Sequence, residues 1–409
     1  MSTPEPTEPA GHEPAANEYA TPEQAQGQPQ GSIRKPAITA VAFVAVAALA
    51  ATAGALIAGG GSGETHEATQ ASDQAGVTQA SGTEVASSVV SSSAVGQYRG
   101  FDDVHQGGDE DLQNVLVSTD WLAERIDEGL AESNIVLIDV SENLPTSELT
   151  AYVDGHIPGA QYVDWTGDFV QANTREFLDA DEITDLLQGL GLNSEDTLVI
   201  YGDNNNWFAA YAAWVFNLYG VPDVRLVDGG LHKWEAVEGR ELVQEVPQRE
   251  RGDFVAQPQN FDIRAFQPDV LEVVEGEANA TLVDIRSEGE YNGEIGVDPA
   301  IFDGEGAAVW GHIPGAVNVA WGSIVNEDGT YKDAEEIRAI YEEAGVDFSE
   351  PIITYCRIGE RASHTWFALS QILGAEVAVY DGSWSEWGNT VGVPVSNNTG
   401  ERGGLWGQS

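Results

Sequence analysis

The segment Gly-His-Ile-Pro-Gly-Ala occurs twice in this chain, at residues 155–160 and 311–316. Each copy lies in the same order among other related segments: an apolar run before it, a second apolar run after it, and later an Asp-Gly pair. These matched segments are 135–140 with 281–286, 198–201 with 352–355, and 227–230 with 380–383. The order is kept once an insertion around residues 293–310 is allowed, so the chain contains two copies of one domain and is not a solenoid of many short repeats.

Short apolar runs of β-forming residues alternate with amphipathic stretches from about residue 115 onward. This alternation is typical of βα units built around a mostly parallel sheet that helices flank. A chain of 409 residues is also long enough for two separate cores. We therefore predict an α/β fold with two copies of the domain. Their predicted bounds are 112–240 and 262–396, with a polar linker over 241–261 and a C-terminal tail over 397–409.

The region before the first domain differs sharply in composition. Residues 1–35 are rich in Pro, Glu, Gln and Ala, which predicts disorder. Residues 36–58 carry no charge and are long enough for a transmembrane helix. Arg34 and Lys35 precede this segment, so the positive-inside rule predicts a membrane anchor with both predicted domains outside the cytoplasm. Residues 59–111 are predicted to be a flexible linker.

Two other interpretations of residues 36–58 stay open. The segment is either a signal peptide that is cleaved before secretion, or an Ala-rich helix that never inserts and leaves the protein in the cytoplasm. The length of the polar segment before it disfavours a simple signal peptide. No feature of the sequence sets an oligomeric state.

The chain has 67 acidic and 17 basic residues, a formal net charge of -50. Nucleic acid is excluded as a partner, because binding it requires clustered Lys and Arg. The acids are dispersed along the predicted domains, and lysine occurs only at positions 35, 233 and 332. We interpret this as a halophilic, solvated acidic surface, since salt weakens the repulsion between like charges.

Cys356 is the single cysteine, so the chain cannot form an intramolecular disulfide. It follows the apolar run 351–355 and precedes the amphipathic run 362–373, which predicts a position at a strand-to-helix turn. There, unpaired N–H groups and the helix dipole stabilise a thiolate. With Arg357 and Arg361 nearby, we expect the pKa of the thiol to fall below the ordinary value of ~8.5, as a nucleophile requires.

Four motifs together resemble the tandem-domain rhodanese family, over about residues 115–395: CRIGERASHTWFAL from Cys356, both HIPGA segments, LVDIRS over 282–287 and YDGSW over 380–384. The resemblance implies two domains of one fold, of which only the second carries the reactive cysteine. Cys356 has that position, and Gly202 has the matching position in the first copy, which is therefore implied to be non-catalytic.

The resemblance implies a thiosulfate sulfurtransferase. Such an enzyme moves a sulfur atom from a small-molecule donor to an acceptor, such as cyanide or a thiol, through a persulfide on Cys356. It implies no cofactor, and no spacing of His, Cys or acids in the chain predicts a metal site. The loop implied to cradle the persulfide consists of Arg357, Ile358, Gly359, Glu360 and Arg361.

Three arginines are candidates to bind the anionic end of the donor: Arg286, Arg357 and Arg361. Paired arginines are suited to gripping oxyanions, although an ion pair with an acid is the competing interpretation for Arg286. Cationic loops are typical of the thiosulfate-using members and neutral loops of the mercaptopyruvate-using members. Ile358 stands where many thiosulfate-using relatives carry lysine, so 3-mercaptopyruvate stays an alternative donor.

A cysteine-dependent phosphatase uses a similar strand–loop–helix device, but with a Cys-x5-Arg loop that usually follows His. Here Tyr355 precedes the cysteine and the spacing to Arg361 is Cys-x4-Arg, a smaller loop that suits a single sulfur atom. A non-catalytic, membrane-tethered binding module is the other alternative.

Several further polar residues have weaker claims to a functional role. His156 and His312 occur in both repeats, including the copy without a cysteine, which indicates a structural role. His364 is a weak candidate proton donor. Two roles stay open for Asp381 and Ser383, hydrogen bonding around the pocket and capping of a helix or turn, and capping is the interpretation that we favour.

Overall fold

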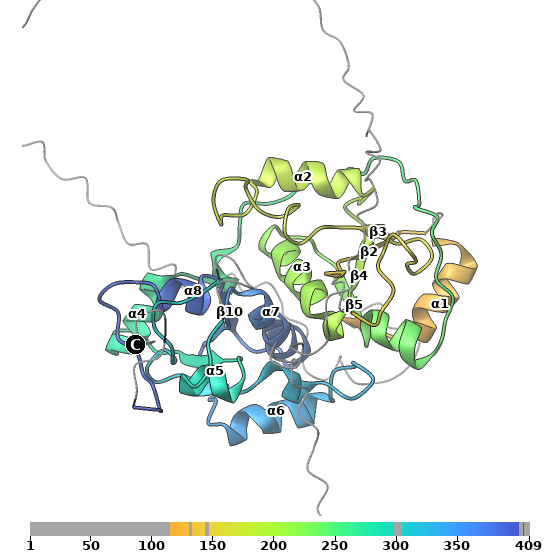
Figure 1. Ribbon diagram of the computed structural model, residues 1–409. Coiled ribbons are helices and arrows are strands. Elements are labelled where there is room, and N and C mark those ends of the chain that lie inside the picture. The colour runs from red at the N-terminus through yellow and green to blue at the C-terminus, as the bar shows by residue number, and fades with distance from the viewer. Residues whose placement is uncertain (1–114, 131–132, 144–146, 298–304, 401–403, 405–409) are drawn as a thin grey trace, which may run out of the picture. The chain divides into compact units, whose positions relative to one another are not determined.

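The structure is a computed structural model that describes residues 115–130, 133–143, 147–297, 305–400 and 404 (Figure 1). The segments predicted to be disordered (1–35), membrane-spanning (36–58) and a flexible linker (59–111) lie outside these ranges. Within the described ranges, no helix has the length and apolar character needed to cross a membrane.

The first domain contains a five-stranded parallel sheet in the order β1-β5-β4-β2-β3. Its strands are β1 (Leu116–Val117), β2 (Ile135–Asp139), β3 (Gln161–Tyr162), β4 (Thr197–Tyr201) and β5 (Val224–Val227). Its helices are α1 (Thr119–Glu128), α2 (Ala180–Gly189), the short η4 (Asn204–Asn206), α3 (Trp207–Leu218) and the π-helix η5 (His232–Val237).

The second domain repeats this sheet in the order β6-β10-β9-β7-β8, which confirms the predicted pair of α/β domains. Its strands are β6 (Arg264–Ala265), β7 (Thr281–Asp284), β8 (Val317–Asn318), β9 (Ile352–Tyr355) and β10 (Val377–Tyr380). Its helical segments are η6 (Phe261–Ile263), α4 (Gln267–Glu275), α5 (Glu288–Asn292), η7 (Trp321–Ile324), α6 (Ala334–Glu343), α7 (Glu360–Trp366), η8 (Phe367–Ile372) and α8 (Ser383–Trp387).

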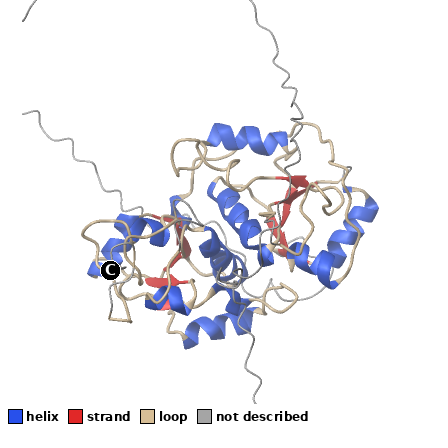
Figure 2. Cartoon of the chain, in the orientation of Figure 1, coloured by secondary structure: helices blue, strands red, loops and turns tan. Residues whose placement is uncertain are grey.

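Each sheet has helices packed on both faces, as the blue helices around the red strands show (Figure 2). Alternate residues of a strand serve opposite faces. In β2, Val136 and Ile138 belong to the buried cluster that contains side chains of α2 and α3, whereas Ile135 and Leu137 belong to the cluster that contains Leu122 of α1. The central strands are buried on both faces, which explains why they are continuous apolar runs in the sequence.

The two domains are in direct contact. Helix α3 packs against α7, and the ring centroids of Trp207 and Trp321 lie 5.3 Å apart. Nearby, the backbone N–H of Tyr331 donates to the carboxylate of Asp228 at 2.9 Å. One large buried apolar cluster contains residues of both domains, so they share part of their core.

The helix after Cys356 differs in detail from the one predicted over residues 362–373. Helix α7 begins at Glu360, two residues earlier, and continues from Phe367 as the π-helix η8. Glu360 therefore lies in the first helical turn, which shortens the loop between β9 and α7 to residues 356–359.

Candidate active site

Cys356 directly follows β9, the central strand of the second sheet, and its side chain is fully buried. Its backbone N–H donates to the hydroxyl of Ser383 at 3.1 Å, and its carbonyl accepts from the backbone N–H of Trp384 at 3.1 Å. Ser383 was expected to cap a turn, and its hydroxyl does donate to the carbonyl of Tyr380 at 2.7 Å. Its additional contact with Cys356 fixes the backbone of the cysteine against the YDGSW segment.

The sequence favours a capping role for Asp381 as well, but its carboxylate forms an ion pair. Its Oδ2 lies 3.2 Å from Nη2 of Arg264, a buried arginine of β6. The sequence suggested a cap because Asp-Gly pairs are frequent in turns. Arg264, which binds this carboxylate, lies 117 positions earlier in the sequence, so no local pattern predicts the ion pair.

The loop after the cysteine turns its backbone toward the sulfur. The N–H of Gly359 donates to the Sγ of Cys356 at 3.1 Å. Gly359 has a φ of +100°, which L side chains rarely adopt, and a Cβ at this position would lie 2.7 Å from the Cα of Asp381. Glycine is therefore required at this position for the loop to curl around the sulfur.

Burial raises the pKa of the Cys356 thiol above its ordinary value, and the charge of Glu360 raises it further. Arg361 and the backbone N–H groups of Ala362 and Gly359 oppose this rise without reversing it. The predicted low pKa is therefore wrong for this structure. The prediction considered the helix terminus and the arginines, whereas the loss of water around the sulfur is the larger effect.

Glu360 brings a carboxylate close to the reactive sulfur. Its Oε2 lies 3.7 Å from Sγ of Cys356, and the side chain is buried. Burial raises the pKa of Glu360, while Arg361 and Arg357 oppose the rise. The thiol proton thus has an acceptor within reach whose own proton affinity is increased.

Both arginines of the loop segment 357–361 are paired with carboxylates. Arg357 forms an ion pair with Glu305, with 2.5 Å between Nε and Oε2. Arg361 pairs with Glu290 through a 3.2 Å contact between Nη2 and Oε1. Burial disfavours the charged form of Glu290, yet Arg361 and Arg286 hold the pKa of this carboxyl at about 2. Both loop arginines are therefore neutralised in this conformation, and their binding of a donor stays a prediction.

Arg286 is buried after β7 and contacts Asp284, with 2.5 Å between Nη2 and Oδ2. Its Nη2 also donates to the carbonyl of Gly311 at 2.7 Å, and its guanidinium lies 4.7 Å from the ring centroid of Trp384. The competing interpretation, an ion pair with an acid, describes this geometry. Binding of a donor by Arg286 stays a prediction.

A small cavity lies beside the loop that follows Cys356. Its walls come from the segments that follow β7, β9 and β10 and from the insertion, and they include Arg286, Glu290, Glu305, Arg357 and Trp384. The space that it offers is about 10 Å³, which holds about one water molecule. In this conformation the ion pair between Glu305 and Arg357 lies in the wall of this cavity.

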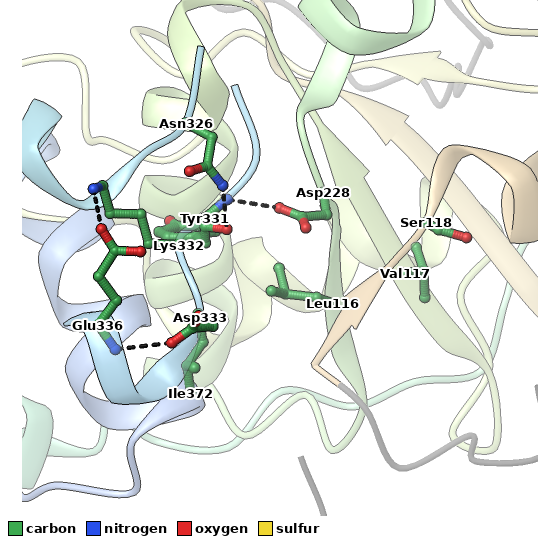
Figure 3. A pocket seen from close by; sticks show the side chains of 10 residues that line it. All are labelled: Leu116, Val117, Ser118, Asp228, Asn326, Tyr331, Lys332, Asp333, Glu336 and Ile372. Atoms are coloured by element: carbon green, nitrogen blue, oxygen red, sulfur yellow. Dashed lines mark hydrogen bonds and ion pairs between the residues drawn. The ribbon is translucent and has the colours of Figure 1, made fainter. Parts of the chain in front are cut away.

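A larger cavity of about 520 Å³ is lined by residues of both domains, and Cys356 is not one of them (Figure 3). Asp228, Asp333 and Glu336 contribute carboxylates to its wall, and Lys332 in the same wall is paired with Glu336. The carboxylates among the described side chains that line this cavity therefore disfavour the binding of an anion.

Gly202 has the position after β4 that Cys356 has after β9. Its N–H donates to the side-chain carbonyl of Asn206 at 3.0 Å, and its carbonyl accepts from the N–H of Leu231 at 2.9 Å. Residues 204–206 are all asparagines with positive φ, a conformation that asparagine tolerates better than most residues. The first domain thus offers no thiol at the position that matches Cys356.

The histidines of the two HIPGA segments are held by backbone groups. His156 and His312 each place Nδ1 near a carbonyl, that of Tyr152 at 2.9 Å and that of Tyr291 at 2.7 Å. Each ring also stacks on the tyrosine concerned. The same arrangement in both copies confirms the structural role predicted for these histidines.

His364 is fully buried in α7 and stacks on Tyr331 with 4.5 Å between ring centroids. Burial lowers the pKa of His364 to about 3. The ring is therefore neutral near neutral pH and a poor proton donor, so the weak candidacy of His364 finds no support in its surroundings.

Sequence reasoning missed the carboxylates that pair with the loop arginines. Glu290 forms a capping box with Ser287 at the start of α5, a pattern that the sequence Ser-x-x-Glu carries. That pattern predicts the helix start but not the ion pair with Arg361, a residue 71 positions away. Glu305 lies in the insertion, where the comparison of the two repeats has no matching residue.

Comparisons with known proteins agree with this geometry. The family profile described as Rhodanese-like domain matches residues 118–237 and 268–390. A protein of Saccharopolyspora erythraea named "Putative thiosulfate sulfurtransferase" is 46% identical over 286 residues, which cover 70% of this chain and 97% of the relative. "Sulfur carrier protein TtuD" of Thermus thermophilus is 46% identical over 285 residues, which cover 69% of this chain and 96% of the relative.

Among solved structures, SseA from Escherichia coli, described as a 3-mercaptopyruvate sulfotransferase with the rhodanese fold, has a TM-score of 0.55 and 29% identity. The match covers 66% of this chain and 98% of SseA. Two matched domains, a cysteine at the loop of the second, and relatives that align over nearly their full length place the chain in a single family: it belongs to the rhodanese family of sulfurtransferases.

Proposed function

We propose that the chain is a thiosulfate sulfurtransferase that carries the transferred sulfur atom as a persulfide on Cys356. The observation that carries the proposal is the short loop in which the N–H of Gly359 points at Sγ from 3.1 Å. A backbone donor in this position stabilises negative charge on the sulfur. The same donor is close enough to serve the terminal sulfur of a persulfide after a small shift of the loop.

The first half-reaction begins with the thiol proton. Glu360 Oε2, 3.7 Å from Sγ, accepts it, and the thiolate attacks the outer sulfur of thiosulfate. The new bond joins Sγ to that sulfur, the bond from the outer sulfur to the sulfonate sulfur breaks, and its electron pair leaves with sulfite. In the second half-reaction a thiolate or cyanide attacks the outer sulfur of the persulfide, and Cys356 leaves as the thiolate. The cycle is a double displacement.

The donor needs space and a cation. Because the space beside the loop is about 10 Å³, entry of thiosulfate requires the contact between Arg357 and Glu305 to separate. The sulfonate then replaces the carboxylate of Glu305 on Arg357, with Arg286 and Arg361 as the further anion-binding residues. Exchange of one anion for another at the same guanidinium keeps its charge compensated.

3-Mercaptopyruvate is the second candidate donor, because the E. coli relative of known structure is described as a 3-mercaptopyruvate sulfotransferase. Family membership also leaves the acceptor open, so cyanide and a small thiol are both to be assayed. A phosphatase and a non-catalytic binding module are the two other candidate functions. They become the functions to test if neither sulfur donor reacts with the protein.

The test is intact mass of the purified full-length protein after exposure to thiosulfate or to 3-mercaptopyruvate. We expect a gain of one sulfur atom with thiosulfate, its loss on addition of cyanide, and no gain in Cys356→Ser. A gain with 3-mercaptopyruvate alone reassigns the donor. If neither donor adds sulfur to the wild-type protein, the proposed sulfurtransferase activity is wrong and release of phosphate from a phosphate monoester is assayed next.

We also propose that residues 36–58 anchor the protein in a membrane, with both domains outside the cytoplasm. The support is the uncharged segment of membrane-spanning length behind Arg34 and Lys35. Cell fractionation tests this proposal: the protein should stay with the membranes in high salt and be released by detergent. Recovery in the medium with a shortened N-terminus indicates a cleaved signal peptide instead, and recovery in the cytoplasm contradicts both.

The acidic composition supports a third proposal, that the folded domains are adapted to high salt. A net charge of -50 produces self-repulsion that salt screens. The midpoint of thermal unfolding should therefore rise as sodium chloride is increased from low to molar concentration. A midpoint that is independent of salt contradicts the proposal.

A further inference from the structure

Arg175, a residue of the first domain, lies against residues 357–361 of the second, the catalytic loop of the proposed sulfurtransferase. Its Nη2 donates to the carbonyl of Ile358 at 2.9 Å, across 183 positions of sequence. Ile358 is two residues after Cys356, and the side chain of Arg175 is exposed to solvent. A guanidinium has five N–H donors, so one bond to a carbonyl leaves capacity to bind a ligand.

The segment that carries Arg175 is a hairpin held in place at its base. Val170 and Phe177 form an antiparallel bridge that closes the hairpin. Glu176, the residue after Arg175, accepts from Nη1 of Arg264 at 2.6 Å. The hairpin of the first domain is therefore tied to a strand of the second.

The same arginine connects the hairpin to the catalytic loop. Arg264 is buried and pairs also with Asp381 at 3.2 Å. Asp381 packs so closely on Gly359 that a Cβ on this glycine would collide with it. The backbone of the hairpin that carries Arg175 is thus held beside the loop by contacts with both domains.

The charges around the loop distinguish Arg175 from the other arginines. Arg357, Arg361 and Arg286 each pair with a carboxylate within 3.2 Å. Arg175 has no carboxylate within ion-pair distance in the described ranges of the chain. The three carboxylates cancel the charges of these three arginines, and Glu360 adds a further negative charge. Without Arg175, the surroundings of the loop would therefore repel an anion.

We propose that Arg175 is a substrate-binding residue that the first domain contributes to the catalytic loop, where it binds the anionic end of the sulfur donor. This proposal rests on the proposed function and deepens it, since it assigns the first domain a part in donor recognition. The class of donor is one with an oxyanion group, a sulfonate or a carboxylate, next to the transferable sulfur. Arg175 releases the carbonyl of Ile358 or shares its remaining donors when the anion arrives.

The first test uses charge-matched reagents that do not depend on sulfur transfer. Iodoacetate and iodoacetamide alkylate the same thiol, have the same leaving group and are nearly equal in size, but only iodoacetate is an anion. The ratio of their rates with Cys356 therefore cancels differences in access to the buried sulfur. The full-length wild-type protein is compared with Arg175→Gln, Arg175→Lys and Arg251→Gln at low ionic strength, where screening is weak.

Arg251 is the matched control, because it is an exposed arginine of the linker that pairs with Asp185. In Arg175→Gln the ratio of the iodoacetate rate to the iodoacetamide rate should fall about tenfold, which corresponds to the loss of about one moderately strong charged contact. In Arg175→Lys and Arg251→Gln it should stay within about twofold of the wild-type ratio. An unchanged ratio in Arg175→Gln, or an equal fall in Arg251→Gln, overturns the proposal.

The second test is steady-state kinetics with thiosulfate. Arg175→Gln should raise KM about tenfold with little change in kcat, as expected when a contact made equally in the ground state and transition state is removed. A fall in kcat at unchanged KM would show that Arg175 only positions the loop, and overturns donor binding. If the wild-type protein does not use thiosulfate at all, the proposed function fails, while the alkylation ratio still decides whether Arg175 attracts anions to Cys356.

Discussion

The Oε2 of Glu360 lies 3.7 Å from the Sγ of Cys356, and both side chains are buried. Burial raises the pKa of the thiol, and the charge of Glu360 raises it further. A state in which Cys356 and Glu360 hold one proton between them is therefore favoured over a state in which both groups are negatively charged. Because the thiolate is the nucleophile, the rate of persulfide formation should increase with pH toward the raised pKa of Cys356.

Glu360→Gln should lower the pKa of the thiol. The amide removes a negative charge beside the sulfur, which stabilises the thiolate and lowers the pKa of the thiol. A loss of ~1.4 kcal/mol of repulsion lowers this pKa by about one unit. The rate of alkylation by iodoacetamide, measured against pH, reports this pKa. Glu350→Gln is the control, because Glu350 is exposed. A thiol pKa that is unchanged or higher in Glu360→Gln contradicts the electrostatic assignment.

The same variant separates two roles of Glu360. If the carboxylate accepts the thiol proton, turnover of Glu360→Gln should fall at low pH values where the thiol is still protonated, in spite of the lower thiol pKa. Turnover should recover at pH values where the thiol ionises without help. Turnover that follows only the thiolate fraction would show that Glu360 acts through its charge alone.

Gly359→Ala should abolish or strongly reduce persulfide formation. The residue has a φ of +100°, and a Cβ would meet the backbone of Asp381 at 2.7 Å. The contact requires the loop to move, which takes the Gly359 N–H away from the sulfur. Gly345→Ala is a matched control, because Gly345 has a φ of +96° and no atom within 4 Å of the added Cβ.

Gly345→Ala introduces the backbone strain of a side chain at positive φ, which costs about 1 kcal/mol, but it does not introduce the contact with Asp381. The difference between the two variants, in the free energy of unfolding and in the mass gain with thiosulfate, therefore isolates the contact with Asp381. Equal effects of both substitutions would show that the loop tolerates a side chain at residue 359.

The sequence predicts the elements of the site that recur or lie next to the cysteine. The repeated HIPGA segments and the apolar runs indicate two parallel sheets, and the position of Cys356 after an apolar run predicts its place at the end of β9. The thiol pKa was predicted in the wrong direction, because the depth at which Cys356 is buried depends on distant packing elements, and a loop sequence does not contain that information. The partners from distant segments, Glu305 and Arg175, also could not be read from any local pattern.

Tyr355 and Tyr201 provide a comparison between the two copies of the domain. Each precedes the loop position, and each hydroxyl accepts the backbone N–H of the HIPGA isoleucine at 3.1 Å, from Ile313 and from Ile157. Replacement of either tyrosine by Phe leaves a buried N–H without its acceptor. Each variant should therefore lose about 1–3 kcal/mol of unfolding free energy, measured by denaturant titration.

The two tyrosine variants should differ in function. Tyr355 directly precedes Cys356, and its ring centroid lies 5.8 Å from the guanidinium of Arg286, whereas Tyr201 precedes Gly202, which carries no thiol. Sulfur transfer should fall in Tyr355→Phe and stay near the wild-type rate in Tyr201→Phe under conditions where both are folded. An equal loss of activity in both variants would show that the first domain affects catalysis beyond its contact through Arg175.

Arg264→Met should destabilise the contact between the domains. Arg264 is buried and neutralises Glu176 of the first domain and Asp381 of the second. Methionine fills similar space but leaves the half-buried Asp381 beside Gly359 without its arginine. Removing one partner of a fully buried pair costs about 3–5 kcal/mol, and partial exposure of the two carboxylates reduces our expectation to about 2 kcal/mol. Denaturant titration measures this loss.

A double-mutant cycle shows whether this cost arises from the uncompensated carboxylate. Asp381→Asn removes the charge, so the combination with Arg264→Met should recover part of the loss, with a coupling of about 1 kcal/mol between the two sites. The thiosulfate KM should also rise in Arg264→Met, because the hairpin that carries Arg175 loses its anchor at Glu176. Additive losses of stability would contradict the pairing, and an unchanged KM would show that the bridge between residues 170 and 177 alone holds the hairpin in place.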